Sequence, residues 1–337
     1  MGGRKGRRRG KRQSKSLRAS GEGRRLWRWV GLSLLALAVA LWAQFGERIK
    51  MQAGLPSAML PDKDDAELRV VTWNLRNFPG SNQDLPRLVA TLDELDADIV
   101  GVQEVKDPEA LRELLPTWKL AMSKKGGRGH QRLGVLYRPG RLDLISEEEF
   151  PELSMGGRVR PAFAAYFRAR PHGPDFYVVV VHLKARPDGH DLRREQWPLL
   201  QQVVERLSKS DGDVVVLGDF NVVGEPDGSA RAELDDLDES MARVGLQRLP
   251  VNEGCTAYWD GARRDAWKEP SLLDLVWVAG MSESLGQNVT ARAGAHCGKH
   301  ACEAFRSTEA YPDLSYEGVS DHCPVAVELR AGEDDDP

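Results

Sequence analysis

The feature that most restricts the fold of this chain is a series of short apolar runs between residues 68 and 329. The runs are rich in Val, Ile and Leu, which is typical of β-strands. Many are apolar at both alternating positions, as strands inside packed layers are. They cover residues 68–75, 97–105, 132–138, 162–169, 176–183, 213–220, 272–279 and 323–329.

Two segments between these runs have helical periodicity instead. Residues 84–96 carry apolar side chains at helical spacing, at Leu85, Leu88, Val89, Leu92 and Leu95. A second helix is expected from about Leu192 to Leu207. Because short strands outnumber helices, we expect one α/β (α+β) domain, in which two sheets pack together and helices cover them on the outside.

The amino-terminal part of the chain has a different composition. Residues 1–28 hold 12 Lys or Arg residues and one acid, a net charge of +11, whereas residues 29–337 have a net charge of −15. Residues 29–45 contain no charged side chain. A spanning helix needs about 20 apolar residues, with a lower limit near 17. Trp29 and Trp42 lie near the two ends, where interfacial aromatic residues are common.

We therefore expect a basic cytoplasmic tail at 1–28, a transmembrane helix or signal anchor at 29–45, a linker at 46–66, a folded domain at 67–330 and an acidic tail at 331–337. A basic flank stays in the cytoplasm, so the folded domain would lie outside it, in the periplasm or extracellular space. The alternative is secretion after signal cleavage, for which residues 41–43 form a poor site.

The four cysteines suit disulfide bonds in an exported domain. Of the three pairings that four cysteines allow, we expect Cys297–Cys302 together with Cys255–Cys323. His296 and His300 lie beside Cys297 and Cys302, so a zinc site is an alternative, although the spacing fits no common zinc finger.

Polar side chains lie at one end of many of the apolar runs. Each alone has an ordinary explanation, such as a turn residue or a buried histidine with satisfied hydrogen bonds. Together they indicate a site, because a rigid core positions functional groups at strand ends. The candidates are Asn74, Glu104, His182, Asp219, Asn221, Asp274, Asp321 and His322.

The chemistry of this set is that of phosphate ester hydrolysis. Glu104 and Asp321 supply hard oxygen ligands for Mg²⁺, with Mn²⁺ or Ca²⁺ as substitutes. Asn74 and Asn221 can bond to phosphate or to a metal-bound water without adding negative charge. The two histidines can move protons near neutral pH. A metal that offsets charge and a base that activates water are the usual requirements of this reaction.

The runs and their polar ends resemble the ordered motifs of the endonuclease/exonuclease/phosphatase superfamily, which has the deoxyribonuclease I-like fold. The motifs are "TWNLRNF", "DIVGVQEV", "RLGVLYR", "VVHLKA", "LGDFN", "SLLDLVWV" and "VSDHCPV". The resemblance covers about residues 68–330, and "GDFN" with a distal "SDH" is its most specific part. It implies a four-layer sandwich of two packed mixed β-sheets flanked by helices, and a Mg²⁺-dependent phosphodiesterase or phosphatase.

The resemblance also implies roles for individual residues. Asn74, Glu104 and Asp321 would lie at the metal and phosphate. Arg160, in "GRVRPAF", resembles the arginine of the family that contacts phosphate, with Arg158 as the alternative.

The remaining roles concern water and proton transfer. His182 would contact the scissile phosphate or protonate the leaving oxygen, and Asp219 and Asn221 would orient the water and bind phosphate. Asp274 would hold His322 in the required tautomer. The family admits either His322 or Asp219 as the base.

One position departs from the pattern of the nucleases most similar to deoxyribonuclease I. These support the first histidine with a glutamate just before the "RLGVLYR"-type strand, where this chain has Gln131. A neutral partner stabilises an imidazolium less, so the resemblance leaves the role of His182 as an acid open.

Cations and aromatic residues favour nucleic acid, with DNA preferred, as the substrate of an extracytoplasmic endonuclease. The cations beside the His182 strand are Lys184, Arg186, Arg193 and Arg194. The 256–271 segment adds Arg263, Arg264, Lys268 and two tryptophans. The alternatives are a lipid phosphodiesterase of sphingomyelinase or phosphoinositide type and a non-catalytic binding module. The sequence implies membrane contact through one amino-terminal helix and no protein partner.

Overall fold

The computed structural model describes residues 60–226, 228–261, 265–281, 284–286 and 289–330. The expected basic tail, the 29–45 segment, most of the linker and the acidic tail lie outside these residues. Among the described residues, none of the helices has the length and apolar composition needed to cross a bilayer.

The first large sheet has six strands in the order β13-β15-β1-β2-β4-β3. Its strands are β1 (Glu67–Phe78), β2 (Ile99–Val105), β3 (Lys119–Met122), β4 (Arg132–Tyr137), β13 (Arg292–Ala293) and β15 (Val325–Arg330). β1 and β2 are parallel, whereas β1 and β15 are antiparallel, so the sheet is mixed.

The second large sheet also has six strands, in the order β5-β6-β7-β8-β12-β9. Its strands are β5 (Leu142–Phe150), β6 (Ala162–Ala169), β7 (Asp175–His182), β8 (Val214–Asp219), β9 (Gln247–Arg248) and β12 (Asp274–Ala279). β7 and β8 are parallel and β8 and β12 are antiparallel, so this sheet is mixed as well. A smaller sheet combines β10 (Ala257–Trp259), β11 (Trp267–Ser271) and β14 (Phe305–Arg306).

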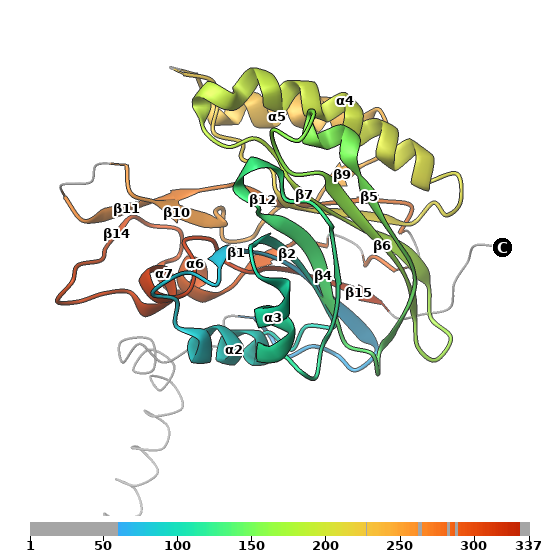
Figure 1. Cartoon of the computed structure of the whole chain (residues 1–337), viewed down its shortest axis with the longest axis horizontal. Coiled ribbons are helices and arrows are strands. Elements are labelled where there is room, and N and C mark those ends of the chain that lie inside the picture. Colours follow the sequence, from blue (N-terminus) through green and yellow to red (C-terminus); the bar gives the residue numbers. More distant parts are fainter. Residues whose placement is uncertain (1–59, 227, 262–264, 282–283, 287–288, 331–337) are drawn as a thin grey trace, which may run out of the picture. The chain divides into compact units, whose positions relative to one another are not determined.

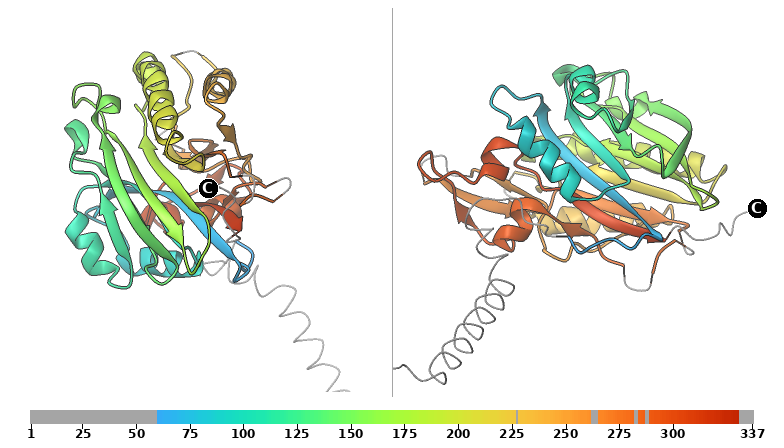
Figure 2. Two further views of the ribbon diagram at one scale, coloured as in Figure 1. Left: turned by 90° about the vertical axis from the view of Figure 1, so that its right-hand side faces the viewer. Right: turned by 90° about the horizontal axis from the view of Figure 1, so that it is seen from below.

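Helices cover the outer faces of both large sheets (Figure 1). Helices α2 (Leu85–Glu94) and α3 (Pro108–Leu114) share an apolar cluster with β1 and β2, and α4 (His190–Leu207) and α5 (Ala230–Ala242) share another with β7 and β8. Figure 2 shows these layers from two further sides. The short helices are α6 (Ala295–His300), α7 (Leu314–Gly318), η1 (Gly127–Gly129), η2 (Pro151–Ser154) and η3 (Pro187–Gly189).

A third apolar cluster fills the space between the two large sheets. It is built from alternate side chains, such as Val70 and Ile99 from the first sheet and Val178, Val215 and Val276 from the second. Side chains two residues apart on a strand point to the same face, so this alternation defines the inner face of every strand. The four-layer arrangement expected from the motifs is confirmed.

All eight predicted strands are present, as β1, β2, β4, β6, β7, β8, β12 and β15, and the two predicted helices are α2 and α4. β5 was not predicted, because this edge strand carries exposed acidic residues along its middle and lacks an apolar run. α5 was also missed, because residues 230–242 hold few apolar positions.

The predicted disulfide pairing is wrong. The structure pairs Cys255 with Cys302 and Cys297 with Cys323, with Cα–Cα distances of 5.6 and 6.1 Å. Cys297 lies within α6 and faces the segment that precedes β15, so that its backbone N–H donates to the sulfur of Cys323. Because all four sulfurs are in disulfides, none is a thiolate, and the alternative of a zinc site is excluded.

Candidate active site

Three titratable residues form a row across the second sheet. The register pairs His182 of β7 with Asp219 of β8, and Asp219 with Asp274 of β12. Directly paired residues point to the same face of a sheet. This row continues the inner face formed further along the same strands by Val180, Leu217 and Val276. The inner face therefore changes from apolar core to polar site at one end of the sheet.

The first sheet adds Asn74 by the alternation of β1 and Glu104 through a β-bulge in β2. The β1–β2 register shifts between Asn74 and Phe78, and the β2–β4 register shifts between Val102 and Val105. Simple alternation would turn Glu104 away from the inner face, but its φ of 61° reorients it. Its Oε1 atom lies 3.9 Å from Nε2 of His182. A bulge that re-aims a side chain beside a site is a recurrent use of this irregularity.

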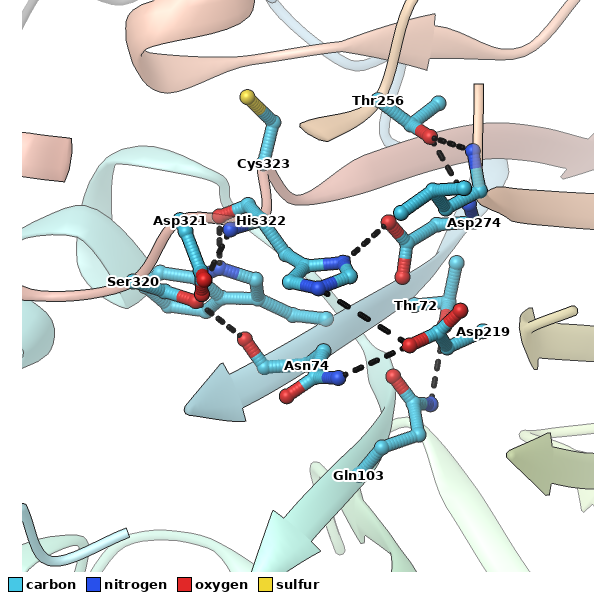
Figure 3. A network of polar contacts seen from close by, with 12 residues as sticks. Thr72, Asn74, Gln103, Asp219, Thr256, Asp274, Ser320, Asp321, His322 and Cys323 are labelled. Atoms are coloured by element: carbon cyan, nitrogen blue, oxygen red, sulfur yellow. Dashed lines mark hydrogen bonds and ion pairs between the residues drawn. The ribbon is translucent and has the colours of Figure 1, made fainter. Parts of the chain in front are cut away.

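His322 is fixed through its ring and through its backbone carbonyl. Its Nδ1 atom lies 2.7 Å from Oδ2 of the fully buried Asp274 (Figure 3). The backbone N–H of Asp274 donates to Oγ1 of Thr256, and the indole of Trp73 donates to the carbonyl of His322. Because Nδ1 is engaged, Nε2 is the ring nitrogen that faces Asp219, at 3.9 Å from Oδ2.

Ser320 fastens the segment that carries His322 to the first sheet. Its hydroxyl donates to the carbonyl of Asn74 at 2.7 Å and accepts the backbone N–H of His322 at 3.1 Å. Ser320, Trp73 and Thr256 were not among the predicted site residues. Ser320 and Trp73 do occur inside the "SDH" and "TWN" motifs, which is the signal that could have found them.

Asp219 lies at the centre of the polar network. Its Oδ2 atom accepts a hydrogen bond from Nδ2 of Asn74 at 3.1 Å and lies 3.3 Å from Nε2 of His182. Its Oδ1 atom accepts the backbone N–H of Asn221 at 2.9 Å. Burial raises the pKa of Asp219 to about 6, although the charge of His322 acts in the opposite direction.

The two histidines have opposite electrostatic environments. Burial alone would lower the pKa of His322, but the charge of Asp274, their hydrogen bond and the charge of Asp219 together raise it well above its usual value. Burial, reinforced by the charge of Arg160, holds the pKa of His182 well below its usual value. His322 is therefore the cationic imidazole and His182 the neutral one.

The carboxylates suit a hard divalent cation. Burial, together with the charges of Asp219 and Asp321, raises the pKa of Glu104. Mutually repelling carboxylate oxygens are the ligands that Mg²⁺ and similar ions take. Ligand atoms of Asp219, Asp274 and His322 also lie within 4.8 Å of one another, but the short hydrogen bond between the last two already engages an atom of each. Glu104 and Asp321, which lie outside the hydrogen-bonded pair of Asp274 and His322, are better placed to hold an ion.

Arg160, and not Arg158, lies at the site. Nη2 of Arg160 donates to the carbonyl of Leu183 at 2.8 Å, and its buried Nε atom has no partner within the described residues. Burial lowers the pKa of Arg160, while the charges of Asp219 and Glu104 oppose that effect. Arg158 is exposed and donates to the carbonyl of Met155.

Gln131 does not take the place of the missing glutamate, because its amide donates to Asn77 at 2.9 Å. Asn221 has a φ of 51°, and its amide nitrogen donates to the carbonyl of Leu183 at 3.3 Å. Asp321 is partly exposed, with Oδ1 at 3.7 Å from Nε of Arg76. The structure thus brings seven of the eight polar candidates into direct contact with another candidate or its backbone, and places Asp321 within electrostatic range of Glu104.

Several cations expected at the substrate have other partners. Arg193 is fully buried and donates to both oxygens of Glu233, at 2.6 and 2.8 Å, so its expected substrate role is wrong. Arg194 pairs with Asp236, and the amino group of Lys184 donates to the adjacent carbonyl of Ala185.

In the 256–271 segment, Lys268 is buried and pairs with Asp260 at 2.8 Å. Arg263 and Arg264 lie outside the described residues. The two tryptophans are surface residues, since Trp259 is 57% and Trp267 is 42% exposed.

A cavity of about 840 Å³ adjoins the site at Asn221. Trp259, Arg186 and Arg231 contribute to its walls. Much of the remaining lining is apolar and comes from Val222, Val223, Leu234, Leu272 and Leu273.

The comparisons with known proteins agree with this geometry. Residues 71–322 match the family model described as "Endonuclease/Exonuclease/phosphatase family". The "Endonuclease/exonuclease/phosphatase family domain-containing protein 1" of Bos taurus is 25% identical over 309 residues, which are 79% of this chain and 50% of that protein. The chain therefore spans half the length of this curated relative.

Solved structures share the fold at low identity. D. rerio TDP2 complexed with a single strand DNA product has a TM-score of 0.57 at 15% identity, over 79% of this chain and 99% of that one. A mannosyl-6-phosphatase of Bacteroides thetaiotaomicron has a TM-score of 0.53 at 22% identity, over 78% and 99%. The human Nocturnin catalytic domain with a bound sulfate anion has a TM-score of 0.52 at 18% identity, over 80% and 96%.

Proposed function

Because this chain belongs to the endonuclease/exonuclease/phosphatase family, whose members are hydrolases of phosphoester bonds, we propose that it is a metal-dependent phosphodiesterase that cleaves nucleic acid, with DNA preferred. The observation that carries the proposal is the position of Asp219, whose Oδ2 atom lies 3.3 Å from Nε2 of His182 and 3.9 Å from Nε2 of His322. Two imidazoles of different charge state and one carboxylate thus face the same small space.

Asn74, Glu104 and Asp321 would hold a divalent ion, with Mg²⁺ as the proposed ion and Mn²⁺ or Ca²⁺ as substitutes. The oxygen donors and the raised pKa of Glu104 fit such an ion, because a cation would relieve the repulsion among the carboxylates. When bound, the ion would offset negative charge on the phosphate oxygens.

The attacking water would lose its proton to Asp219, beside the imidazolium of His322. Asp274 holds the ring of His322 so that Nε2 faces the reacting space, and its carboxylate stabilises the imidazolium. Asp219, whose pKa lies at about 6, can accept a proton near neutral pH.

The remaining residues would bind the phosphate. His182 is neutral, so it serves as a hydrogen-bonding contact to the scissile phosphate rather than as a charged acid. The buried Nε of Arg160 has no partner within the described chain and can donate to a phosphate oxygen. Asn221 would contribute a further donor without adding charge.

The cavity at Asn221 supports a nucleic acid substrate. Trp259 is an exposed aromatic residue in the lining of this cavity, which also includes Arg186 and Arg231. Bases stack on aromatic side chains and phosphates pair with cations, so this combination suits a single strand or an opened end. A solved neighbour of the same fold was determined with a single strand DNA product.

A lipid phosphodiesterase is the second candidate, and the apolar lining of the same cavity favours it. Val222, Leu234 and Leu272 would accept an acyl chain as readily as a base. Membrane attachment by the 29–45 segment would place the enzyme near such a substrate.

We propose that the domain acts outside the cytoplasm. Its two disulfides support an oxidising compartment, because glutathione and thioredoxin keep cytosolic thiols reduced. The charge-free 29–45 segment after a basic tail supports an amino-terminal anchor, with secretion after cleavage as the alternative.

Nicking of supercoiled plasmid by the full chain tests the function. Cleavage is expected in Mg²⁺, to stop in EDTA, and to be lost in His322→Ala. His172→Ala is the matched control, because His172 is exposed in a turn. Hydrolysis of sphingomyelin or phosphoinositide vesicles without any nicking in Mg²⁺, Mn²⁺ or Ca²⁺ would replace the nuclease proposal with the lipid one.

A further inference from the structure

A second cavity, of about 520 Å³, is lined by basic side chains that the proposed mechanism does not use. Its lining also includes Pro151, Val159 and Pro161. We call it the basic hollow and define it by Lys106, Lys124, Lys125, His130 and Arg132.

The basic hollow begins next to the candidate active site. Lys106 comes two residues after Glu104, and Arg132 pairs with Val105 in the β2–β4 ladder, where the two strands lie side by side (Figure 1). Val159 and Pro161, which line the hollow, flank Arg160 in the chain.

Gly127 holds the basic loop against this wall. Its φ is 63°, and a Cβ atom at this position would lie 2.4 Å from the carbonyl oxygen of Val159. The loop that carries Lys124, Lys125 and His130 is therefore packed against the chain next to Arg160.

The cations of the hollow are not neutralised by the protein. Within the described residues, none of its five basic side chains takes part in an ion pair. The acid in its lining is Glu149, whose carboxylate accepts the backbone N–H groups of Lys124 and Lys125 at 2.6 and 3.1 Å. The carboxylate therefore fixes the loop and leaves the ammonium groups free.

The charge of the hollow is opposite to that of its surroundings. Residues 60–330 hold 33 Lys or Arg residues and 45 Asp or Glu residues, a net charge of −12, so the domain as a whole repels polyanions. A concave site with an excess of one sign of charge concentrates the electric field and attracts the opposite ion locally. The hollow would therefore direct an anionic substrate to one flank of the site.

We propose that the basic hollow binds phosphate groups of a polynucleotide other than the one being hydrolysed. This rests on the proposed nuclease function and deepens it, because a substrate that fills both places carries a run of phosphates. A sphingolipid with a single phosphate cannot do so.

The test compares two substrates on the full chain. A twelve-residue oligothymidylate can reach the hollow, whereas bis(p-nitrophenyl) phosphate carries one phosphate. Lys124→Ala with Lys125→Ala is expected to lower the ratio of kcat/KM for the oligonucleotide to that for the small ester by about tenfold. The slope of log KM against the logarithm of the salt concentration should also decrease by about 1.4, because each of the two lost contacts to single-stranded DNA contributes about 0.7.

The matched control is Lys119→Ala with Lys209→Ala, which removes the same charge from two exposed lysines elsewhere on the chain. In this control, the ratio of kcat/KM for the oligonucleotide to that for the small ester should stay within about twofold of the ratio for the unmodified chain. An equal loss in both double variants would indicate general electrostatics and overturn the proposed subsite.

Binding separates this proposal from the nuclease function. Fluorescence anisotropy of the labelled oligonucleotide in EDTA, with His322→Ala as the background, measures the hollow without cleavage. If the enzyme cuts DNA but neither binding nor the ratio depends on Lys124 and Lys125, the subsite is wrong and the function stands. If DNA is not cut but binding weakens in the double variant, the subsite stands and the function is wrong.

Discussion

Nδ1 of His322 lies 2.7 Å from Oδ2 of Asp274, although 48 positions separate the two residues in the chain. Asp274 begins β12 of the second sheet, and His322 lies three residues before β15 of the first sheet. This contact therefore joins the two sheets at the end where their inner faces become polar.

Asp274→Asn should lower kcat strongly, by about a hundredfold or more. The amide removes the negative charge that keeps His322 an imidazolium, so the positive charge beside Asp219 is lost. Steady-state cleavage of plasmid measures the effect, with circular dichroism to establish folding. Asp236→Asn, at an exposed ion pair with Arg194, is the control. Unchanged kcat in a folded Asp274→Asn protein would remove this pair from the mechanism.

Glu104→Gln should raise the Mg²⁺ concentration that gives half-maximal activity by about tenfold or more, because one hard ligand loses its charge. Activity measured against metal concentration and calorimetric titration of the ion report the change independently. Glu109→Gln, an exposed residue of α3 that pairs with Arg112, should leave both unchanged. Equal metal affinities in the two variants would place the ion elsewhere.

Asp313 should make the domain lose stability in acid. Burial favours its protonated form, but hydrogen bonds from His300, Lys299 and the backbone of Tyr316 outweigh burial and hold the pKa of Asp313 well below its usual range. The unfolded chain therefore takes up a proton first, near pH 4, so the contribution of the carboxylate is present above that pH and is lost progressively as the pH falls from there toward the lower pKa of the folded state.

Asp313→Asn retains the helix cap but has no carboxylate to protonate. It should be less stable than the unmodified chain at pH 6, and the difference should shrink toward pH 3. Urea unfolding at several pH values measures the difference. A difference that stays constant with pH would contradict the assigned charge state.

Arg193→Ala should destabilise the domain by about 3–5 kcal/mol, because it leaves Glu233 charged and unpaired inside the protein. Arg193→Met combined with Glu233→Leu should recover much of that loss, since neither charge then remains. Chemical unfolding distinguishes the two variants. If the Arg193→Ala protein is fully stable and only binds DNA more weakly, Arg193 belongs to the substrate site after all.

The disulfide pairing can be read directly from peptides. Lys299 lies between Cys297 and Cys302, so trypsin separates these two cysteines unless they are bonded to each other. Non-reducing digestion followed by mass spectrometry should give a Cys255–Cys302 peptide and a Cys297–Cys323 peptide. Removal of either bond should cost about 2–4 kcal/mol of stability.

The sequence was most informative where chemistry and periodicity coincide. Each buried strand was visible as an apolar run. The polar residue after the run marked the end of the strand that lies at the candidate active site, as with Asp219 after "VVVLG". Glu104 was predicted from its motif, but its orientation depends on a bulge that alternation does not reveal.

The errors concern residues whose environment depends on distant elements. Arg193 on a helix was taken for a surface cation, because only the position of α5 places Glu233 against it. The disulfide partners were missed because the direction in which α6 turns Cys297 is decided by its packing against the segment before β15.

The row formed by His182, Asp219 and Asp274 depends on the hydrogen-bond register of three strands. A slip of one residue in β8 would turn Asp219 to the helix-covered face while leaving a strand that is apolar on both sides. Such a slip would cost little in hydrophobic burial and would remove the central carboxylate. Activity should therefore report the alignment of β8 more sensitively than any measurement of unfolding, and substitutions in the core beneath it can inactivate a protein that remains folded.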